Sequence, residues 1–337
     1  MVNVAVVGAG YWGPNLIRNF AACPLAKLVA VCDKDRGRLD KVLAPYPAVE
    51  KVADTESLLA REDIDAVAIA TPVNTHAPIG LAALRAGKHV LIEKPLAGSV
   101  RDAAELVRTA KEVGRVLMVD HTFIYSGPVQ KIKQIVDSGD LGEIYYVDSV
   151  RINLGLFQHD INVVWDLAPH DLSIMDHIIG KLPKSLSAFG TCHTDPESGI
   201  EDVAYLNLDF GEGLLASFHV NWLSPVKVRH FLIGGSRQGL VYNDLSPDEK
   251  IKVYDRGITI SEDAESRRGV LIGYRTGDVW SPKIEPVEPL QRMVTHFAEC
   301  VQDGKQPLTN GEAGLRVVRI LEAAQHSIKA QGGRITL

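Results

Sequence analysis

Two short stretches carry side chains that could move a proton. Glu93-Lys94-Pro95 follows the apolar run 88–92 and places an ammonium group beside a proline, whose ring restricts the turn. Asp166 and His170 lie four residues apart, so a helix would present both side chains on one face. A neutral imidazole can accept the proton of an alcohol during its oxidation. These residue types are compatible with alcohol oxidation; the alternatives are a solvated Lys94 and a purely structural His170.

The stretch WDLAPHDL, residues 165–172, predicts the beginning of a helix over 166–179. Pro169 has no N–H group and therefore belongs in the first helical turn. Asp166 would then cap free N–H groups at the helix start. The helix dipole would favour the neutral form of His170.

The same predicted helix contains several residue types that bind metals, namely Asp166, His170, Asp171, Asp176 and His177. Asp176 and His177 fall a turn or more beyond the others. Because no second cluster completes a coordination shell, we predict no metal site.

Glycines at positions 8, 10 and 13 form the pattern GxGxxG between an apolar run and a helical segment. In a dinucleotide-binding fold Gly8 permits the tight turn, Gly10 lets the pyrophosphate approach, and Gly13 allows close packing of helix and strand. The helix N-terminus would face the phosphate charge. The N–H groups of Tyr11 and Trp12 are expected to face the pyrophosphate, with both rings packed around the site.

Asp33 supports this interpretation, because it closes the second apolar run 20 residues after Gly13. That is the spacing of an acid that accepts hydrogen bonds from the adenosine ribose. A carboxylate there would repel a 2′-phosphate, which favours NAD over NADP. Lys34 and Arg36 lie close enough to soften this preference.

The first 120 residues alternate apolar runs with helical segments, of which 100–113 is the longest. Mainly apolar runs of this length are typical of strands buried on both faces of a parallel sheet. They span residues 3–7, 27–32, 66–70, 88–92 and 115–119. The pattern predicts an α/β protein with an N-terminal, doubly wound Rossmann domain over residues 1–122.

After about residue 140, strand-like runs follow one another, some with alternating polarity, as in 203–210. Alternation predicts an antiparallel sheet with one face on a core. The runs span 144–152, 185–193, 202–210, 214–222, 227–233, 240–243 and 251–254. We expect a loop at 256–285 and helices at 289–302 and 311–331. Residues 123–337 are thus predicted to form an α+β domain with a large, open, mostly antiparallel sheet, and the C-terminal helices could pack back on the first domain.

The composition is that of an ordinary globular protein, with 46% apolar and 23% charged residues among 337. A net charge of −6 without any basic block argues against nucleic acid as a partner. Four widely spaced cysteines form no CxxC pair, which fits a reduced, cytoplasmic chain. No signal peptide is evident, and no apolar run approaches the roughly 18 residues of a membrane span.

The sequence resembles the glucose-fructose oxidoreductase, inositol dehydrogenase and rhizopine catabolism (Gfo/Idh/MocA) family along essentially its whole length. The matching stretches are GAGYWG, ATPVNTH, EKP, the pattern DxxxHD at 166–171, and 289–301 with 307–311. This resemblance implies a Rossmann domain followed by an α/β domain whose open sheet often forms homodimers or homotetramers. It thereby implies that the domain at 123–337 serves substrate binding and oligomerisation. It also implies hydride transfer between a nicotinamide and a hydroxyl carbon of a sugar, cyclitol or related compound.

The resemblance also implies roles for single residues. Lys94 would orient the substrate hydroxyl and take part in proton transfer, with His170 as its acid/base partner. Asp166 would bind substrate or orient His170, and the bond before Pro95 is often cis in this family. The division of acid/base roles between Lys94 and His170 stays open. The implied cofactor contacts are Gly8, Gly10, Tyr11, Trp12, Gly13, Asp33, Thr71, Asn74, His76, Glu93 and Lys94.

Within the family, GYWGPNLIRNF and WDLAPHDLSIMD are most similar to enzymes that oxidise C3 of UDP-N-acetylglucosamine or of its uronic acid. His121 and Tyr125, after the fifth run, could contact such a substrate. A diphosphate needs cations or backbone donors, although each cation could equally be a solvated strand residue. The candidates are Arg151, Asn153, Lys227 and Arg229. Two other functions stay open: a dehydrogenase of a free sugar or inositol, and a non-catalytic NAD-binding redox sensor.

Overall fold

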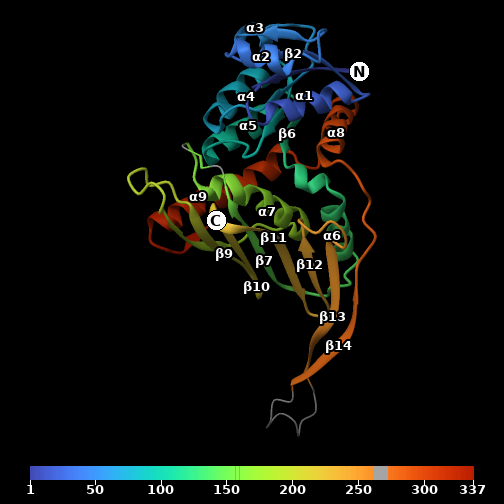
Figure 1. Cartoon of the computed structure of the whole chain (residues 1–337), viewed down its shortest axis with the longest axis vertical. Coiled ribbons are helices and arrows are strands. Elements are labelled where there is room, and N and C mark those ends of the chain that lie inside the picture. The colour runs from blue at the N-terminus through green and yellow to red at the C-terminus, as the bar shows by residue number, and fades with distance from the viewer. Residues whose placement is uncertain (156, 159, 261–271) are drawn as a thin grey trace. The chain divides into compact units, whose positions relative to one another are not determined.

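The computed structural model describes residues 1–155, 157–158, 160–260 and 272–337. The chain divides into two compact units (Figure 1). The first consists of Met1–Ser126 and Val287–Glu322, and the second of Gly127–Pro286 and Ala323–Leu337. The boundary predicted after residue 122 lies close to the first junction. The segment 287–322, which was included in the second domain with the alternative that its helices pack back on the first, belongs to the first unit.

Six parallel strands form the sheet of the first unit, in the order β3-β2-β1-β4-β5-β6. Their bounds are β1 Val2–Val7, β2 Ala26–Cys32, β3 Glu50–Val52, β4 Ala66–Ile69, β5 His89–Glu93 and β6 Leu117–Asp120. Five of them lie within a residue or two of the predicted runs. The edge strand β3 was not predicted, because its three residues are largely exposed and carry no apolar run.

Helices and short 3₁₀ turns connect these strands. Their bounds are α1 Gly13–Ala22, α2 Arg36–Val42, α3 Thr55–Leu59, η1 Val73–Thr75, α4 His76–Arg85, α5 Val100–Glu112 and η2 Thr122–Tyr125. Helix α8 (Pro289–Asp303) returns from the other end of the chain to complete the core of this unit. Its Phe297 meets Phe20 of α1 edge to face, with ring centroids 6.3 Å apart.

Nine strands form the sheet of the second unit, in the order β14-β13-β12-β11-β7-β10-β9-β8-β15. Only β7 and β10 pair in parallel among the described pairs, so the sheet is mostly antiparallel. The bounds are β7 Ile144–Leu154, β8 Ser185–Thr191, β9 Val203–Gly211, β10 Leu214–Asn221, β11 Leu223–Gly235, β12 Gly239–Asn243, β13 Ile251–Ile260, β14 Ile272–Trp280 and β15 Ile335–Thr336. The predicted fold class is confirmed.

The loop predicted at 256–285 is wrong for most of its described residues. Strand β13 continues to Ile260 and pairs with β14, while 261–271 lie outside the described residues. Several side chains of this two-stranded ribbon, such as Arg256, Ile258 and Thr276, are exposed, so polar residues do not prevent strand pairing. The polarity that suggested a loop belongs to a solvated sheet edge.

Helices α6 (Gly127–Asp137), α7 (Val163–Ile179) and α9 (Gly311–Lys329) complete the described helices. Alternate residues of β9, namely Ala204, Leu206 and Leu208, are buried, whereas Tyr205 and Asn207 between them are exposed. The sheet thus has one buried and one open face. Within the described residues, no helix combines the length and apolarity that crossing a membrane requires.

Candidate active site

Loops at one edge of the six-stranded sheet carry the predicted cofactor residues. All its strand pairs are parallel, so the carboxyl ends of the strands share one edge. Along this edge Asp33 follows β2, the glycine-rich loop follows β1, Thr71 follows β4 and Lys94 follows β5. Ligands of open α/β sheets bind outside these ends. The fold therefore places the predicted residues of the first unit in one row.

The glycine-rich loop has the shape of a nucleotide-binding turn. Gly8 has φ +102°, and a Cβ there would lie 2.4 Å from the carbonyl oxygen of Ala70. A Cβ on Gly13 would lie 2.0 Å from the carbonyl oxygen of Gly8. At Gly10 the nearest atom to such a Cβ is Nη1 of Arg38, at 4.0 Å. The backbone itself requires Gly8 and Gly13, while Gly10 borders open space that a ligand can enter.

The start of α1 and the Asp33 carboxylate offer complementary groups to a dinucleotide. Among the described residues, no side chain caps α1 and no acid lies in its first turn, so its N–H groups suit an anion. Asp33 Oδ2 accepts a hydrogen bond from Ala9 N at 2.7 Å. The carboxylate is thereby held against the loop, as an acid that binds ribose hydroxyls must be. These residues fit NAD.

Tyr11 and Trp12 have different surroundings. The indole of Trp12 packs against the core and donates from Nε1 to Asp120 Oδ2 at 2.9 Å. The Tyr11 side chain is 85% exposed. The prediction that both rings pack around the site therefore needs correction for Tyr11, whose ring finds no apolar neighbour to cover it in the described chain.

The loop after β4 is tied to the loop after β5 by His76. Its Nδ1 lies 2.9 Å from the carbonyl oxygen of Pro95, and its Nε2 lies 2.8 Å from that of Thr71. Burial lowers the pKa of His76, and a neutral ring donates to only one of these two oxygens. The buried ring thus holds both loops. Asn74, in η1, is exposed, and its side chain is accessible to a ligand at this edge.

Lys94 follows the last residue of β5, and its bond to Pro95 is cis. The Glu93 carboxylate accepts a hydrogen bond from the backbone N–H of Lys94. Burial and, to a smaller extent, the positive charge of Lys94 lower the pKa of His121 to about 3. Lys94 therefore acts electrostatically on the loop after the neighbouring strand β6.

His121 is a buried imidazole, 2% exposed. Neither of its ring nitrogens has a hydrogen-bond partner among the described residues. Buried polar atoms usually find partners, so such orphaned nitrogens indicate a group that binds a ligand or water. This position is compatible with the predicted contact of His121 with substrate.

Asp120, the last residue of β6, was not predicted as a site residue. Its carboxylate is 2% exposed and accepts hydrogen bonds from Trp12 Nε1 and Thr122 Oγ1. Burial raises the pKa of this carboxyl group, and the hydrogen bonds and the charge of Lys94 oppose that shift. The sequence feature that could have identified Asp120 is its position as an acid directly after an apolar run, at the carboxyl edge of the predicted sheet.

Tyr125 was predicted to contact the substrate, but its side chain is not accessible to one. Its ring is 3% exposed in the core of the first unit, and its hydroxyl lies 3.0 Å from His296 Nδ1 and 3.4 Å from Thr309 Oγ1. Burial raises the pKa of this hydroxyl. Tyr125 therefore holds η2 against α8 and the segment before α9.

Helix α7 carries Asp166 and His170 but begins earlier than predicted. Asn162 is its N-cap, with Oδ1 accepting from Trp165 N at 3.1 Å, and Pro169 lies inside the helix. Asp166 instead accepts from Trp222 Nε1 at 3.1 Å. His170 is seven positions beyond Val163, too far from the helix start for the predicted effect of the dipole. Asp166 and His170 still share a face.

Arg151 of β7 was a predicted cation for the diphosphate, but its charge is already paired within the chain. It is 4% exposed and bonded twice to Asp171 of α7, by Nε at 2.9 Å and Nη2 at 2.7 Å. Asn153, two residues on, is half-buried on the same face of β7. Arg229 Nη1 binds Asp244 at 3.0 Å, but its buried Nε has no partner among the described residues, and Lys227 is exposed.

Arg151→Met is expected to lower the free energy of unfolding by about 3–5 kcal/mol, because Asp171 would keep an uncompensated buried charge. Urea denaturation followed by circular dichroism measures the free energy of unfolding. The control is Lys181→Met, which removes an exposed pair with Glu212 at 3.9 Å and should cost less than about 1 kcal/mol. Equal losses in the two variants would contradict a structural role for Arg151.

Among the described residues, no group of three or more histidines, cysteines and acids is arranged to hold a metal ion. Among the candidate metal ligands, Asp171 is already bound by Arg151.

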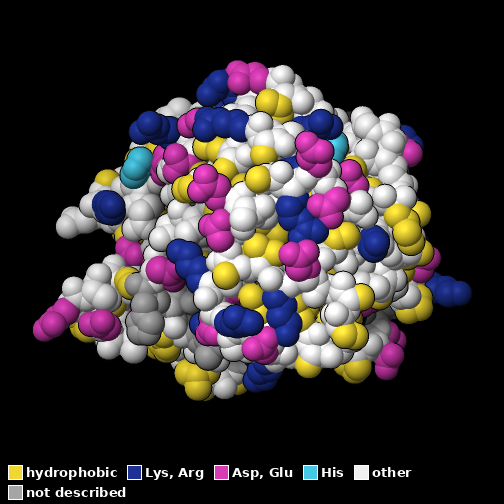
Figure 2. Space-filling model, turned by 90° about the horizontal axis from the view of Figure 1, so that it is seen from above, with side chains coloured by type: hydrophobic (Ala, Val, Ile, Leu, Met, Phe, Trp, Pro, Cys, Tyr) yellow, Lys and Arg dark blue, Asp and Glu magenta, His cyan; other side chains and the backbone are white. Residues whose placement is uncertain are grey.

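In the described part of the face seen in Figure 2, positive and negative side chains are interspersed.

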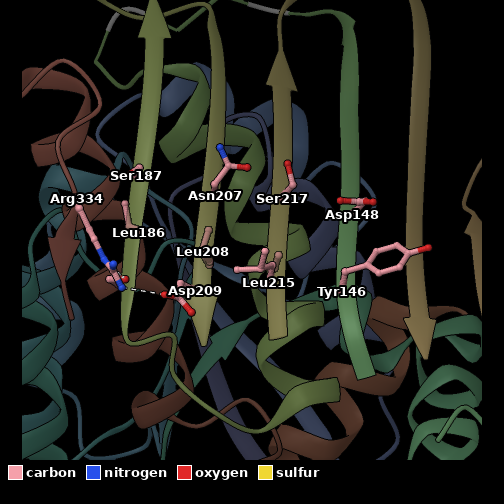
Figure 3. A pocket seen from close by; sticks show the side chains of 12 residues that line it. Tyr146, Asp148, Leu186, Ser187, Asn207, Leu208, Asp209, Leu215, Ser217 and Arg334 are labelled. Atoms are coloured by element: carbon pink, nitrogen blue, oxygen red, sulfur yellow. Dashed lines mark hydrogen bonds and ion pairs between the residues drawn. The ribbon is translucent and has the colours of Figure 1, made fainter. Parts of the chain in front are cut away.

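A cavity of about 440 Å³ lies on the open face of the second unit's sheet (Figure 3), and neither Asp166 nor His170 is among its lining residues. Its lining includes Tyr146, Asp148, Asn207, Leu215, Ser217 and Arg334. Arg334 is paired with Asp209 at 2.9 Å. None of the predicted catalytic or cofactor residues lines this cavity, so we do not place the chemistry there.

Family models match both parts of the chain. One, described as "Oxidoreductase family, NAD-binding Rossmann fold", matches residues 2–121. The other, described as "GFO/IDH/MocA C-terminal domain", matches residues 129–241. Together they extend over more than half of the chain.

The chain is similar to proteins of different named activities. It is 25% identical to 2,7-anhydro-N-acetylneuraminate hydratase of Escherichia coli (strain K12), covering 96% of this chain and 94% of that protein. It is 26% identical to scyllo-inositol 2-dehydrogenase (NAD(+)) of Bacillus subtilis (strain 168), covering 91% and 88%. The structure of UDP-N-acetylglucosamine 3-dehydrogenase GnnA from Acidithiobacillus ferrooxidans has a TM-score of 0.82 at 24% identity, covering 97% of each chain. That last likeness shows the fold alone.

Proposed function

The chain belongs to the Gfo/Idh/MocA family of oxidoreductases, with an NAD-binding Rossmann fold, and on this premise we propose that it oxidises a secondary hydroxyl group of a sugar. The observation that carries the proposal is the place of Lys94, at the carboxyl end of β5 in the same row as the glycine-rich loop. When bound, NAD accepts a hydride. The residues of the chain bind and orient the substrate and receive its hydroxyl proton.

Lys94 and His170 share the proton transfer in this proposal. The Lys94 ammonium group orients the hydroxyl oxygen, and its charge stabilises the negative charge that develops there. His170, on α7, is the acid/base partner in this proton transfer. Asp166 is fixed by Trp222 and lies one turn before His170, where it orients the imidazole or binds a neighbouring hydroxyl group.

We further propose that the substrate is a UDP-sugar oxidised at C3, such as UDP-N-acetylglucosamine or its uronic acid. The support is the similarity of GYWGPNLIRNF and WDLAPHDLSIMD to enzymes of that kind. With Arg151 neutralised by Asp171, Lys227 and Arg229 are the remaining predicted cations for the diphosphate. The orphaned Nε of Arg229 supports a ligand at this position.

A substrate screen tests both levels of the proposal. NADH absorbance and product mass are followed with UDP-sugars, free sugars and inositols, each with and without a keto-acid acceptor. We expect NADH and a product lacking two hydrogens only with UDP-sugars. One relative is named a hydratase, and a reaction without net oxidation would not accumulate NADH. Product mass is therefore measured together with absorbance, because it detects such a reaction.

The alternatives make different predictions in the same screen. Oxidation of inositols or free sugars alone would reject the UDP-sugar but keep the dehydrogenase. A single-turnover reaction at stoichiometric enzyme detects cofactor that is reduced but not released. NAD binding without reduction by any hydroxyl compound in that format would favour the redox sensor.

We also propose that two copies of the chain associate through the open sheet face of the second unit. Its exposed apolar residues include Tyr146, Phe189, Tyr205 and Leu215. Registers place Phe189 opposite Tyr205, and Leu215 opposite Tyr146, so these side chains form paired patches on one face. Exposed apolar area of this kind indicates an interaction surface, and homo-oligomers use self-complementary ones.

Leu215→Arg combined with Phe189→Arg is therefore expected to convert the oligomer to monomers. Two arginines in place of apolar side chains would have to lose their hydration in the interface, which is costly. Light scattering after size exclusion measures the mass. Val113→Arg, at an exposed apolar residue in the first unit, is the control. A wild-type chain that is already monomeric at micromolar concentration would contradict the proposal.

A cytoplasmic location is the last part of the proposal. All four cysteines are free, and Cys23, Cys32 and Cys300 are buried. Free thiols are typical of reducing compartments. Cell fractionation with an antibody to the chain tests the location, and recovery from an oxidising compartment would contradict it.

A further inference from the structure

We propose that Asp120 is a positioning residue that connects the cofactor loop to Lys94: its carboxylate holds the glycine-rich loop through Trp12 and provides a counter-charge to the lysine. The inference rests on the proposed function of Lys94. None of the sequence motifs assigns a role to Asp120, whose neighbours in the first unit include Trp12, Glu93 and Thr122.

The contact with the cofactor loop is a single hydrogen bond. Trp12 is the residue before Gly13, and so the last residue before α1 begins. Its Nε1 donates to Asp120 Oδ2 at 2.9 Å, across 108 positions of sequence. Hydrogen bonds to a carboxylate are about twice as strong as neutral ones. The bond therefore fixes the end of the turn whose N–H groups are available for the pyrophosphate.

Strand register brings Asp120 to the level of the lysine. Asp120 of β6 is the partner of Glu93 of β5, the residue before Lys94. Neighbouring strands lie about 4.8 Å apart, so the segments after them begin side by side. The electrostatic effect of Lys94 on both Asp120 and His121 agrees with this placement.

Asp120 is a buried acid that the positive charge of Lys94 reaches. Titratable groups of the first unit near Asp120 and Lys94 include His76, His121 and Tyr125, and Glu93 lies in the adjoining strand. Burial lowers the pKa of both histidines and raises that of Tyr125, so all three are neutral near pH 7. The Glu93 carboxylate bonds to the backbone of Lys94.

Two substitutions separate the two roles. Trp12→Phe removes the hydrogen bond and keeps the ring and the Asp120 charge, so we expect NADH binding to weaken roughly 3- to 10-fold. Asp120→Asn keeps an oxygen that can accept from Trp12 but removes the charge. Because a nearby carboxylate favours the protonated amine, the pH profile of turnover should move to lower pH.

The measurements include readouts that need no substrate. NADH binding is titrated by fluorescence. In protein with ¹³C-labelled lysine, the side-chain signal of Lys94, assigned by its loss in Lys94→Arg, is followed against pH. We expect its titration at lower pH in Asp120→Asn than in wild type. Thr122→Val is the control, because it removes one hydrogen bond to Asp120 but leaves the Asp120 charge and the Trp12 contact. It should change NADH binding less than Trp12→Phe does, and the Lys94 signal less than Asp120→Asn does.

Unchanged NADH binding in Trp12→Phe would overturn the anchoring role. An unchanged Lys94 signal in folded Asp120→Asn would overturn the counter-charge role, and thermal unfolding establishes that the variant is folded. If no sugar is oxidised by the wild-type chain, the proposed function fails while these two readouts still decide the inference.

Discussion

Lys94→Ala is expected to lower turnover by at least about a thousandfold while NAD still binds. The side chain is the cation at the carboxyl end of β5, where it would meet the reacting hydroxyl group. General acid–base groups contribute about 10²–10⁴-fold, and stabilisation of a developing oxyanion adds to this. The pyrophosphate and ribose contacts assigned to the glycine-rich loop and Asp33 remain in the variant. Steady-state rates and NADH fluorescence titration measure the two effects separately.

The matched control is Lys27→Ala, which removes an exposed lysine of β2 in the same unit. It should retain wild-type turnover. His170→Ala, in the second unit, should also abolish turnover if that imidazole exchanges the proton. More than a tenth of wild-type turnover in both Lys94→Ala and His170→Ala would reject the assigned chemistry.

Gly13→Ala is expected to abolish NAD binding. Its Cβ would lie 2.0 Å from the carbonyl oxygen of Gly8, a backbone atom that moves only with the whole turn. Separation of strand β1 from helix α1 would displace the N–H groups that suit the pyrophosphate. We expect at least a hundredfold weaker binding of NADH and a clearly lower melting temperature, both measurable on purified protein.

Gly10→Ala is the matched comparison within the same loop. Its Cβ meets nothing closer than Nη1 of Arg38 at 4.0 Å, so the melting temperature should stay near that of the wild type. NADH binding should still weaken, because the methyl group occupies the space that the pyrophosphate needs. A Gly10 variant with unchanged binding would mean that the dinucleotide does not pass over this loop.

Local pattern predicted the part of the site that strand ends position. Apolar runs located β1, β2, β4, β5 and β6, and the rule that ligands bind at carboxyl ends pointed to the loops after them. Gly8, Asp33 and Lys94 could be found this way because each is the first or nearly the first residue after a strand. Their position depends on local sequence alone.

Residues whose role depends on a distant partner could not be found from sequence. Arg151 resembles any strand cation until Asp171 of α7 is seen beside it. Tyr125 bonds to His296, 171 positions away. Asp120 acquires its role from Trp12, which precedes it by 108 positions. Such pairs are formed by tertiary packing, and one sequence does not reveal them.

Helix α7 shows two local rules in competition. Pro169 suggested a helix start at 166, since an interior proline costs about 3 kcal/mol. The structure instead begins the helix at Val163, capped by Asn162. Burial of Val163 and Val164, both 0% exposed, contributes about 1.5–3 kcal/mol each and outweighs the lost hydrogen bond.

The first unit uses both ends of the chain, and this affects the order in which the protein can mature on the ribosome. Its apolar core includes Leu290, Met293, Val294 and Phe297 of α8. These residues are synthesised only after the entire described sheet of the second unit except β15. Until then, the nascent N-terminal segment exposes the apolar surface that α8 later covers. A nucleotide-binding fragment cut after residue 126 would lack part of its own core, so the chain must be expressed and engineered as one piece.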